Sequence, residues 1–410
     1  MQIDIRGIAD WLIDGARSSP VVTDMVSELC GRLVAAGIPL WRVGFFIRTL
    51  HPEIYGRSFI WKPGEAVVVG SVDFDIQQTP EFIASPLAIV FGEAKEVRCR
   101  IDDAKSRRFP FLDDMRAEGV TDYVAMPLRY IDGFTHASSW TTKQAGGFTD
   151  EQLAALRSVL PALTRLIEVI GLRRVAATLL DTYVGNRAGT RILDGQIRRG
   201  HGETMHAAIW LSDLRGFTAL SDRLPAETVV DMLNRYFDCQ VASIRAHDGE
   251  VLKYMGDGLL AVFPIDEYVG DAQLVCSHVL EAAQDTRASV EALQYPVGDA
   301  IERFRFGVAL HVGSILYGNI GGGNRLDFTC IGPAVNLAAR LEKIAGRLGR
   351  TVVASEGFAG ICSGGWDDLG EFPIAGFSRA QRVYGLMDEA SRAHPGYGSG
   401  WQRTTPPARS

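Results

Sequence analysis

Two aspartates stand where strand-like segments of the sequence end. The apolar run Ala207 to Leu211 leads to Asp213, and a Gly216-Phe217-Thr218 turn then opens a polar helical segment. Asp257 lies in a Gly-Asp-Gly sequence between two short apolar segments, which predicts a tight hairpin. Carboxylates at the ends of adjacent strands can share a pair of divalent cations, an arrangement that stabilises the attacking and leaving oxygens of phosphoryl transfer.

Each aspartate also has an ordinary interpretation. An aspartate after a strand is commonly a helix N-cap, and Gly-Asp-Gly is commonly a turn without further function. A third segment, DFTCIGPAVNLAARLE at 327–342, adds to the chemical interpretation. Pro333 suits the first turn of a helix, on which Asn336 and Arg340, four residues apart, share one face. A guanidinium suits charge that develops on phosphorus, and an amide can orient a ribose, although a solvated arginine on an amphipathic helix is the alternative.

These three motifs together, in this order, resemble the catalytic domain of class III nucleotidyl cyclases over roughly residues 203–387. The resemblance implies a ferredoxin-like core that works as an antiparallel, head-to-tail homodimer. It implies two divalent cations per site, Mg²⁺ or Mn²⁺, held by Asp213, Asp257 and the backbone of Leu214. The ribose 3′-hydroxyl of the nucleotide would then attack the α-phosphorus in line and release pyrophosphate.

The resemblance also implies roles for the other residues. Asn336 and Arg340 would act on the transition state, and Arg350 would contact the triphosphate. The backbone of Gly216, Phe217 and Thr218 would cradle phosphate oxygens at the start of a helix. In a dimer of this kind, Asp213 and Asp257 come from one chain, and Lys253, Thr329, Asn336 and Arg340 come from the other, so a homodimer has two sites and a monomer has none.

Base selection in this family falls to Lys253 and Thr329. A lysine donor and a hydroxyl acceptor complement N1 and N6 of adenine, whereas guanylate cyclases typically place Glu and Cys there. The Lys and Thr combination therefore favours ATP, although Cys330 lies one residue from the second position. One departure is Ala375 before Gly376, where the family often has a triphosphate-binding lysine; Arg379 or Arg382 are the possible substitutes.

The elements expected around these motifs alternate between helix and strand. Helical spacing of apolar residues predicts helices over 225–247 and 271–293, and residues 304–311 alternate like a strand. This order indicates an α+β domain with a central sheet. We therefore expect residues 203–387 to form the catalytic domain.

Residues 1–170 predict a mixed α/β domain of their own. A helix over 21–36, strands over 41–48 and 120–128, and a closing helix capped by Thr149 or Asp150 resemble, in this order, a GAF-type sensor domain. Such a domain would bind an unknown small-molecule or protein effector. Candidate pocket or haem residues are His51, His136, Trp61, Tyr123 and Cys99, but no pair has ligand spacing, and a single loop histidine is more often simply exposed.

Residues 171–202 continue the helical pattern, break at Gly185-Asn186 and resume near Arg191. They are either a plain linker or a transducer helix that pairs with its twin in a homodimer. Residues 391–410 are rich in Gly, Pro, Ser and Arg, which predicts disorder.

Composition limits the remaining possibilities. The 410 residues allow about two domains, and 42 basic against 49 acidic residues give a net charge of −7, which argues against nucleic-acid binding. No basic leader or long apolar run occurs, so we expect a cytoplasmic protein without membrane insertion. The six cysteines lack CxxC spacing and predict buried free thiols. We expect a homodimeric adenylate cyclase that makes cyclic AMP from ATP; a guanylate cyclase or a silent nucleotide-binding module are the alternatives.

Overall fold

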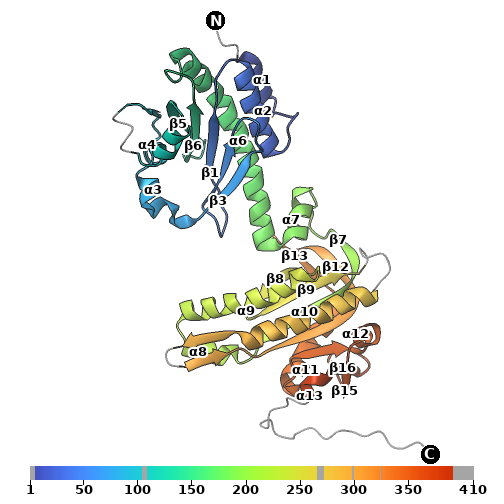
Figure 1. Cartoon of the computed structure of the whole chain (residues 1–410). Helices are drawn as coiled ribbons and strands as arrows, with labels where there is room; N and C mark the ends of the chain where they lie inside the picture. The colour runs from blue at the N-terminus through green and yellow to red at the C-terminus, as the bar shows by residue number, and fades with distance from the viewer. Residues whose placement is uncertain (1–4, 104–108, 266–271, 298–299, 324, 391–410) are drawn as a thin grey trace, which may run out of the picture. The chain divides into compact units, whose positions relative to one another are not determined.

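The computed structural model describes residues 5–103, 109–265, 272–297, 300–323 and 325–390 (Figure 1). The chain forms two units, Met1–Thr182 and Tyr183–Ser410. The boundary lies inside the expected linker, and the expected disordered tail falls outside the described residues. No helix among the described residues is long and apolar enough to cross a membrane.

The first unit contains a six-stranded antiparallel sheet in the order β3-β2-β1-β6-β5-β4. Its strands are β1 (Arg42–Arg48), β2 (Gly56–Trp61), β3 (Val68–Val72), β4 (Val97–Arg100), β5 (Asp122–Arg129) and β6 (Thr135–Thr142). The helices are α1 (Arg6–Ile13), α2 (Val22–Ala35), α3 (Pro80–Ile83), α4 (Pro86–Glu93), α5 (Leu112–Ala117) and α6 (Asp150–Val184), with the 3₁₀ helix η1 (Phe74–Gln78). The helices over 21–36 and from 150 and the strands over 41–48 and 120–128 were predicted from the sequence.

Side-chain alternation along the strands gives this sheet two apolar faces. Val43 and Phe45 pack with α1, α2 and α6, whereas Phe46 packs on the opposite side with α4 and α5. Of the two predicted caps for α6, Thr149 is the one used: its hydroxyl accepts from the Gln152 amide (3.2 Å), and the Gln152 side chain accepts from the Thr149 amide (2.9 Å). The helix then runs without interruption for 35 residues.

The second unit is built on an eight-stranded sheet that includes the order β12-β7-β9-β8. Together with α9 and α10, these strands give the βαββαβ arrangement of the expected ferredoxin-like core. They are β7 (Gly202–Leu214), α9 (Ala226–Ala246), β8 (Glu250–Met255), β9 (Gly258–Pro264), α10 (Ala272–Ala292) and β12 (Phe306–Gly322). The chain adds α7 (Asn186–Leu193), α8 (Phe217–Arg223), β10 (Gln294–Val297), β11 (Ala300–Arg303), β13 (Arg325–Ile331), α11 (Pro333–Leu348), β14 (Val352–Ser355), α12 (Glu356–Ile361), β15 (Trp366–Phe372), β16 (Gln381–Leu386) and α13 (Met387–Ala390).

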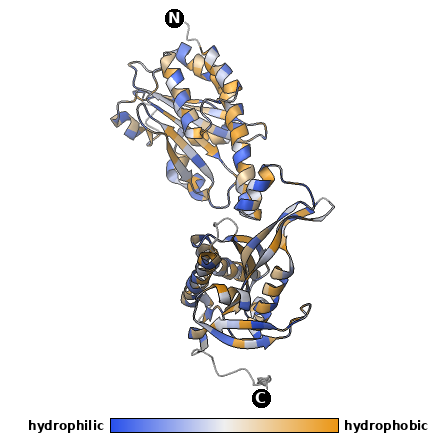
Figure 2. Cartoon of the chain, turned by 90° about the vertical axis from the view of Figure 1, so that its right-hand side faces the viewer, coloured by the Kyte–Doolittle hydropathy of each residue, from blue (hydrophilic) through white to orange (hydrophobic). Residues whose placement is uncertain are grey.

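Alternation along β7 assigns helices to the two faces of this sheet. Ala208 and Trp210 pack with α9 and α10, which lie side by side in Figure 1. Ala207, Ile209 and Leu211 point to the other face, where α7 and α11 lie. In Figure 2, orange and blue alternate along the helices, as expected when each helix has one apolar face. Asp213 continues the odd-numbered series and therefore lies on the face of α11.

The cysteines agree with the sequence prediction. All six are free thiols; Cys239 is half-buried, and Cys30, Cys99, Cys276, Cys330 and Cys362 are buried. Burial raises the pKa of the Cys330 thiol to about 11, so it stays protonated at neutral pH. Trp61, Tyr123 and Cys99, considered as pocket residues, are core residues.

Candidate active site

Asp213 and Asp257 are brought together by two neighbouring strands. Asp213 is the penultimate residue of β7, and Asp257 lies in the two-residue turn between β8 and β9. Ser212 is paired with Leu259 across β7 and β9, which sets the turn beside the end of β7. A Cβ at position 258 would lie 2.2 Å from the Ser212 carbonyl oxygen, so only glycine permits this approach.

The two carboxyl groups are close enough to hydrogen-bond to each other, and this changes the chemistry of Asp213. Burial, and then the charge of Asp257, raise the pKa of Asp213 to about 6. The Arg215 guanidinium and the Leu214 amide act in the opposite direction. Two adjacent carboxylates that destabilise each other's charge form a ready cation site, because a bound cation removes the repulsion.

Arg215 and Glu342 belong to this cluster, and the sequence analysis did not identify them. Arg215 follows Asp213 by two residues, passes over Gly307 and donates to the Arg350 carbonyl oxygen (2.7 Å). Glu342, on α11, is 8 % exposed, and burial together with the charges of Asp213 and Asp257 raises its pKa to about 7. Glu342 and Asp213 in turn favour the charged form of Arg215. A half-buried arginine therefore lies between the carboxylate pair and α11.

A signal for these two residues was present in the motifs. Glu342 follows Arg340 by two positions, which is about 200° around a helix, so it had to face the sheet if Arg340 faced outward. Arg215 lies two residues after Asp213, within SDLRGFT. Both look like ordinary surface charges until the register of β7 with β12 is known.

The donor set fits a hard divalent cation. Carboxylate oxygens and a backbone carbonyl, here that of Leu214 at the end of β7, are the ligands that Mg²⁺ and Mn²⁺ prefer. Among the described residues, no group of three or more His, Cys, Asp or Glu side chains could hold a metal ion. Two carboxylates alone suit Mg²⁺, which commonly takes its remaining ligands from water and substrate phosphates.

Asn336 and Arg340 lie on the outer face of α11, as their spacing predicted. Both are exposed, while Leu337, Ala338 and Leu341 on the opposite side are buried. Neither the Asn336 amide nor the Arg340 guanidinium makes a hydrogen bond or ion pair with a described residue. Within one chain, the carboxylate pair and these two side chains are thus separate groups.

Lys253 and Thr329 come from β8 and β13, two strands that contact each other although β8 pairs with β9 and β13 pairs with β12. The Lys253 ammonium pairs with the carboxylate of Asp327, and the two side chains remain 44 % and 49 % exposed. Thr329 lies two residues along β13 from Asp327, hence on the same face, and is half-buried. Asp327, which the sequence analysis left without a role, holds the lysine beside the threonine.

The expected phosphate-binding backbone is a short turn. Gly216 (φ 75°) precedes α8, which begins at Phe217 and includes Thr218. Gly216 and Thr218 are exposed, and Phe217 packs partly against the core. Gly216 follows Asp213 by three residues, so this turn begins close to the end of β7.

Arg350, the expected triphosphate contact, has partners within its own chain. Its guanidinium donates to the Leu386 carbonyl oxygen (3.1 Å) and to Asp367 (2.6 Å), and its side chain is only 14 % exposed. Because these contacts engage both ends of the guanidinium, Arg350 links the start of β14 to β15 and β16. Arg382, one possible substitute for the missing lysine, pairs with Asp368 and Glu371, and Ala375 is exposed.

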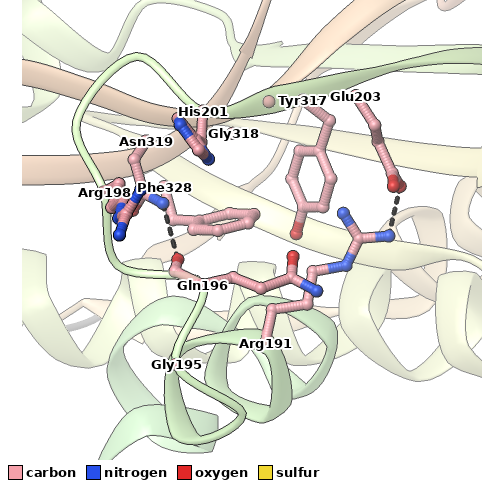
Figure 3. Close-up of a pocket in the computed structure, with 11 residues that line it drawn as sticks. Arg191, Gly195, Gln196, Arg198, His201, Glu203, Tyr317, Gly318, Asn319 and Phe328 are labelled. Carbon is pink, nitrogen blue, oxygen red and sulfur yellow. Dashed lines mark hydrogen bonds and ion pairs between the residues drawn. The ribbon is translucent and has the colours of Figure 1, made fainter.

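A separate cavity of about 470 Å³ lies where the chain enters this unit (Figure 3). The Asn319 side chain donates to the Gln196 carbonyl oxygen (2.7 Å), and Arg191 pairs with Glu203. None of the predicted site residues lines this cavity. Its importance is structural, because it marks where residues 195–202 attach to β12.

Comparison with known proteins identifies the second unit. Residues 201–359 match the family model described as the adenylate and guanylate cyclase catalytic domain. The chain is 29 % identical over 160 residues to an adenylate cyclase of Anabaena cylindrica, and 31 % identical over 172 residues to adenylate cyclase 1 of Rhizobium meliloti. These alignments cover 39 % and 42 % of this chain but only 31 % and 25 % of those relatives.

Solved structures of both specificities resemble the chain. A bacterial light-regulated adenylyl cyclase matches with 26 % identity and a TM-score of 0.40, covering 45 % of this chain and 92 % of that one. A guanylyl cyclase matches with 25 % identity and a TM-score of 0.38, covering 45 % and 93 %. From the family match and the adenylate cyclase relatives, we conclude that the second unit contains a class III adenylate/guanylate cyclase catalytic domain.

Proposed function

We propose that this protein is an adenylate cyclase that converts ATP to 3′,5′-cyclic AMP and pyrophosphate at a homodimer interface. The observation that carries this proposal is the pairing of Asp213 with Asp257 at the ends of adjacent strands, where burial and mutual repulsion raise the pKa of Asp213 to about 6. Such a pair favours cation binding, and the cyclase reaction requires charge neutralisation on a triphosphate.

Different residues of the chain would have different roles in this reaction. Asp213, Asp257 and the Leu214 carbonyl would hold two divalent cations, which supply Lewis-acid activation of the ribose 3′-hydroxyl and neutralise the triphosphate. The Arg340 guanidinium would stabilise charge on the α-phosphate, and the Asn336 amide would orient the ribose for in-line attack. The exposed backbone from Gly216 to Thr218 is available to phosphate oxygens.

Two groups that one chain keeps apart favour a dimeric site. Asn336 and Arg340 lie exposed on α11 and have no side-chain partner among the described residues, whereas Asp213 is part of the partly buried cluster on the opposite side of that helix. A second copy can bring its Arg340 to the first copy's carboxylates, and the reverse, which gives two equivalent sites.

Lys253 and Thr329 support adenine as the base. With its ammonium held by Asp327, Lys253 donates toward N1, and the Thr329 hydroxyl accepts from the N6 amino group. Guanine would present a donor at N1 and an acceptor at O6. The ammonium would face the N1 donor and the hydroxyl would lose its amino partner, so we expect GTP to be the poorer substrate.

We further propose that the first unit is a GAF-like regulatory domain, and that the helix α6 and the segment to residue 202 transmit its state. The support is an antiparallel six-stranded sheet with helices on both faces, followed by one uninterrupted helix.

One alternative has an observation in its favour. A silent nucleotide-binding module would explain why Ala375 replaces the usual lysine and why Arg350 is engaged inside the fold. Guanylate cyclase activity is the second alternative, and its support is that the matching family model describes adenylate and guanylate cyclases together.

The test is cyclic nucleotide production by the purified full chain, given ATP or GTP with Mg²⁺ or Mn²⁺, beside Asp257→Asn. We expect cyclic AMP from ATP and at least a hundredfold loss in the variant, because the substitution removes a charge from the cation site without changing its shape. Cyclic GMP as the main product would overturn the base assignment. Nucleotide binding without turnover, in a demonstrated dimer, would favour the silent module.

A further inference from the structure

The first unit contains a second cavity, of about 360 Å³, between the ends of its central strands and α6. Its walls come from β1, β2, η1, the turn between β5 and β6, and α6. They are mostly apolar and include Ile47, Phe59, Phe74, Phe134 and Ile170. This volume is in the range of small-molecule sites, and apolar walls with few polar groups are typical of them.

Arginines are the polar groups of this cavity. Arg48, Arg57 and Arg174 line it, none of the three forms an ion pair with a described residue, and the only acidic side chain in the lining is Asp132. Burial, and then the nearby charge of Arg174, lower the pKa of Arg57. Among the described residues, the lining therefore carries three arginines against one carboxylate, which leaves it with a net positive charge.

Arg48 is held in place without an anionic partner. Its guanidinium lies over the ring of Phe91 (4.9 Å) and the ring of Tyr55 (5.3 Å). Its Nε is buried and has no hydrogen-bond partner, and the same is true of the Tyr130 hydroxyl in the same cavity. Buried donors without partners are rare in proteins, and a ligand that accepts hydrogen bonds would satisfy both.

His136 adds a neutral donor. It is 3 % exposed, its Nδ1 accepts from the Arg48 amide (3.0 Å), and its ring lies against that of Tyr130, with centroids 3.9 Å apart. Burial and the charge of Arg48 lower the pKa of His136 to about 4. The neutral ring therefore carries its proton on Nε2, in the lining of the cavity.

We propose that this cavity binds a small amphiphilic carboxylate, an alkyl or aromatic acid whose head lies on Arg48 and Tyr130 and whose body lies along α6. A guanidinium and a carboxylate form paired, charge-assisted hydrogen bonds, and the apolar walls stabilise a hydrocarbon body. An uncharged apolar molecule would leave the Arg48 Nε unpaired, and a bare inorganic anion would leave the walls unfilled.

The location of this site connects it to the proposed regulation of the cyclase. This connection, unlike the binding site itself, depends on the proposed function. Residues 167–175 of the cavity wall belong to α6, which continues to Val184, past the boundary between the units. A ligand against this wall fixes the α6 segment that leads into the catalytic unit. The site itself does not depend on the cyclase proposal.

The test is calorimetric titration of the full chain, without nucleotide, with three probes. Decanoate has both a hydrocarbon chain and a negative charge. Decan-1-ol has a hydrocarbon chain of the same length without the charge, and inorganic phosphate has negative charge without a hydrocarbon chain. We expect only decanoate to bind well, and Arg48→Gln to weaken it roughly tenfold or more, the value of a charge-assisted hydrogen bond. Arg17→Gln, which changes an exposed arginine outside the cavity, is the matched control and should bind like the parent chain.

A second variant keeps the proposal testable if Arg48→Gln folds poorly. Gly171 lies in α6 at the cavity wall, and a Cβ there would approach only the Tyr130 hydroxyl, at 3.8 Å. Gly171→Leu should fill the cavity and abolish decanoate binding while raising helix propensity. Decanoate should also slow hydrogen exchange in residues 167–175.

Three results would overturn the proposal. They are equal binding of decan-1-ol and decanoate, undiminished binding to Gly171→Leu, and binding that leaves exchange in 167–175 unchanged. These experiments measure ligand binding and hydrogen exchange, not turnover, so they can be interpreted even if the second unit is inactive. Failure of this proposal is therefore distinguishable from failure of the cyclase proposal.

Discussion

Near Asp213 and Asp257, one arginine interacts with several charged side chains. Arg215 is attracted by Glu342, Asp213 and Glu389 and repelled by Arg305, and burial lowers its pKa. Such a residue compensates several partly buried acids at once, so its removal leaves more than one charge without a partner. Residues that share a partner in this way give non-additive mutational effects.

We therefore predict that Arg215→Met lowers the free energy of unfolding by about 3 kcal/mol, because it leaves buried carboxylates uncompensated. The double variant Arg215→Met, Glu342→Met should be less destabilised than the sum of the single variants by roughly 1–3 kcal/mol. Urea denaturation at pH 7 measures both. Arg235→Met, which removes an exposed i,i+4 pair with Asp231, is the control and should cost at most about 1 kcal/mol. Strict additivity would contradict the shared role of Arg215.

His136 makes a prediction about pH. Its pKa in the folded state is about 4 against the ordinary 6.5, so the unfolded chain binds a proton between these values and the native chain does not. The contribution of His136 to the free energy of unfolding should therefore be fully present above pH 6.5 and should fall by up to about 3 kcal/mol as the pH drops to 4. Urea denaturation at pH 7 and at pH 4.5 gives this contribution.

The matched variant is His136→Asn, whose side-chain oxygen can still accept from the Arg48 amide but does not titrate. It should lose less stability than the parent chain between the two pH values. An identical pH dependence in the parent and in His136→Asn would assign the acid sensitivity to other groups.

At the level of elements, the sequence predicted local structure well and long-range pairing poorly. The helices over 225–247 and 271–293, the Gly-Asp-Gly hairpin and the helix that begins at Pro333 are present within a few residues of their predicted ends. Apolar spacing and turn residues determine these, and both are local. By contrast, the strand expected over 304–311 extends to Gly322 because it pairs first with β7 and then with β13.

The same reason explains what was missed at the site. Lys253 meets Asp327 and Arg215 meets Glu342 only after strands distant in sequence have paired. The cavity of the first unit likewise draws its walls from five segments. Motif spacing identified the groups with chemical functions, but their partners depend on sheet register, which no local pattern encodes.

The attachment of residues 195–202 to β12 gives a prediction about the contact between a connecting segment and a strand. Asn319, 5 % exposed, donates to the main-chain carbonyl of Gln196, and its own backbone exchanges hydrogen bonds with Gly200 and His201. Asn319→Ala should raise the rate of tryptic cleavage at Arg198 and Arg199 by roughly fivefold or more, because a net hydrogen bond of about 1 kcal/mol is lost locally.

Gln196→Ala is the matched control for this experiment. It preserves the carbonyl that accepts the bond, so its cleavage rate should stay close to that of the parent chain. Equal acceleration in both variants would mean that the Gln196 side chain, and not the bond from Asn319, protects this segment.

For the whole molecule, the separation of the two half-sites leads to a complementation experiment. Asp257→Asn and Arg340→Ala should each be inactive as homodimers, since each damages both sites. When the two variants are co-expressed, half of the dimers are mixed and each mixed dimer has one intact site, so about a quarter of the parent activity should return. Cyclic AMP production by the co-purified mixture measures this. Absence of recovery, with mixed dimers demonstrated, would place both half-sites within one chain.

The unbroken course of α6 has a geometric consequence. Each residue of an α-helix turns the chain by 100° and advances it by about 1.5 Å, so the side chains of α6 that follow Pro161, as far as Val184, have a fixed angular phase relative to the cavity of the first unit. A single residue inserted after Val175 would rotate everything that follows by about a quarter turn, whereas seven inserted residues would nearly restore the original phase while lengthening the helix. The signal that we propose α6 transmits would therefore depend on a rotation angle as well as on a distance.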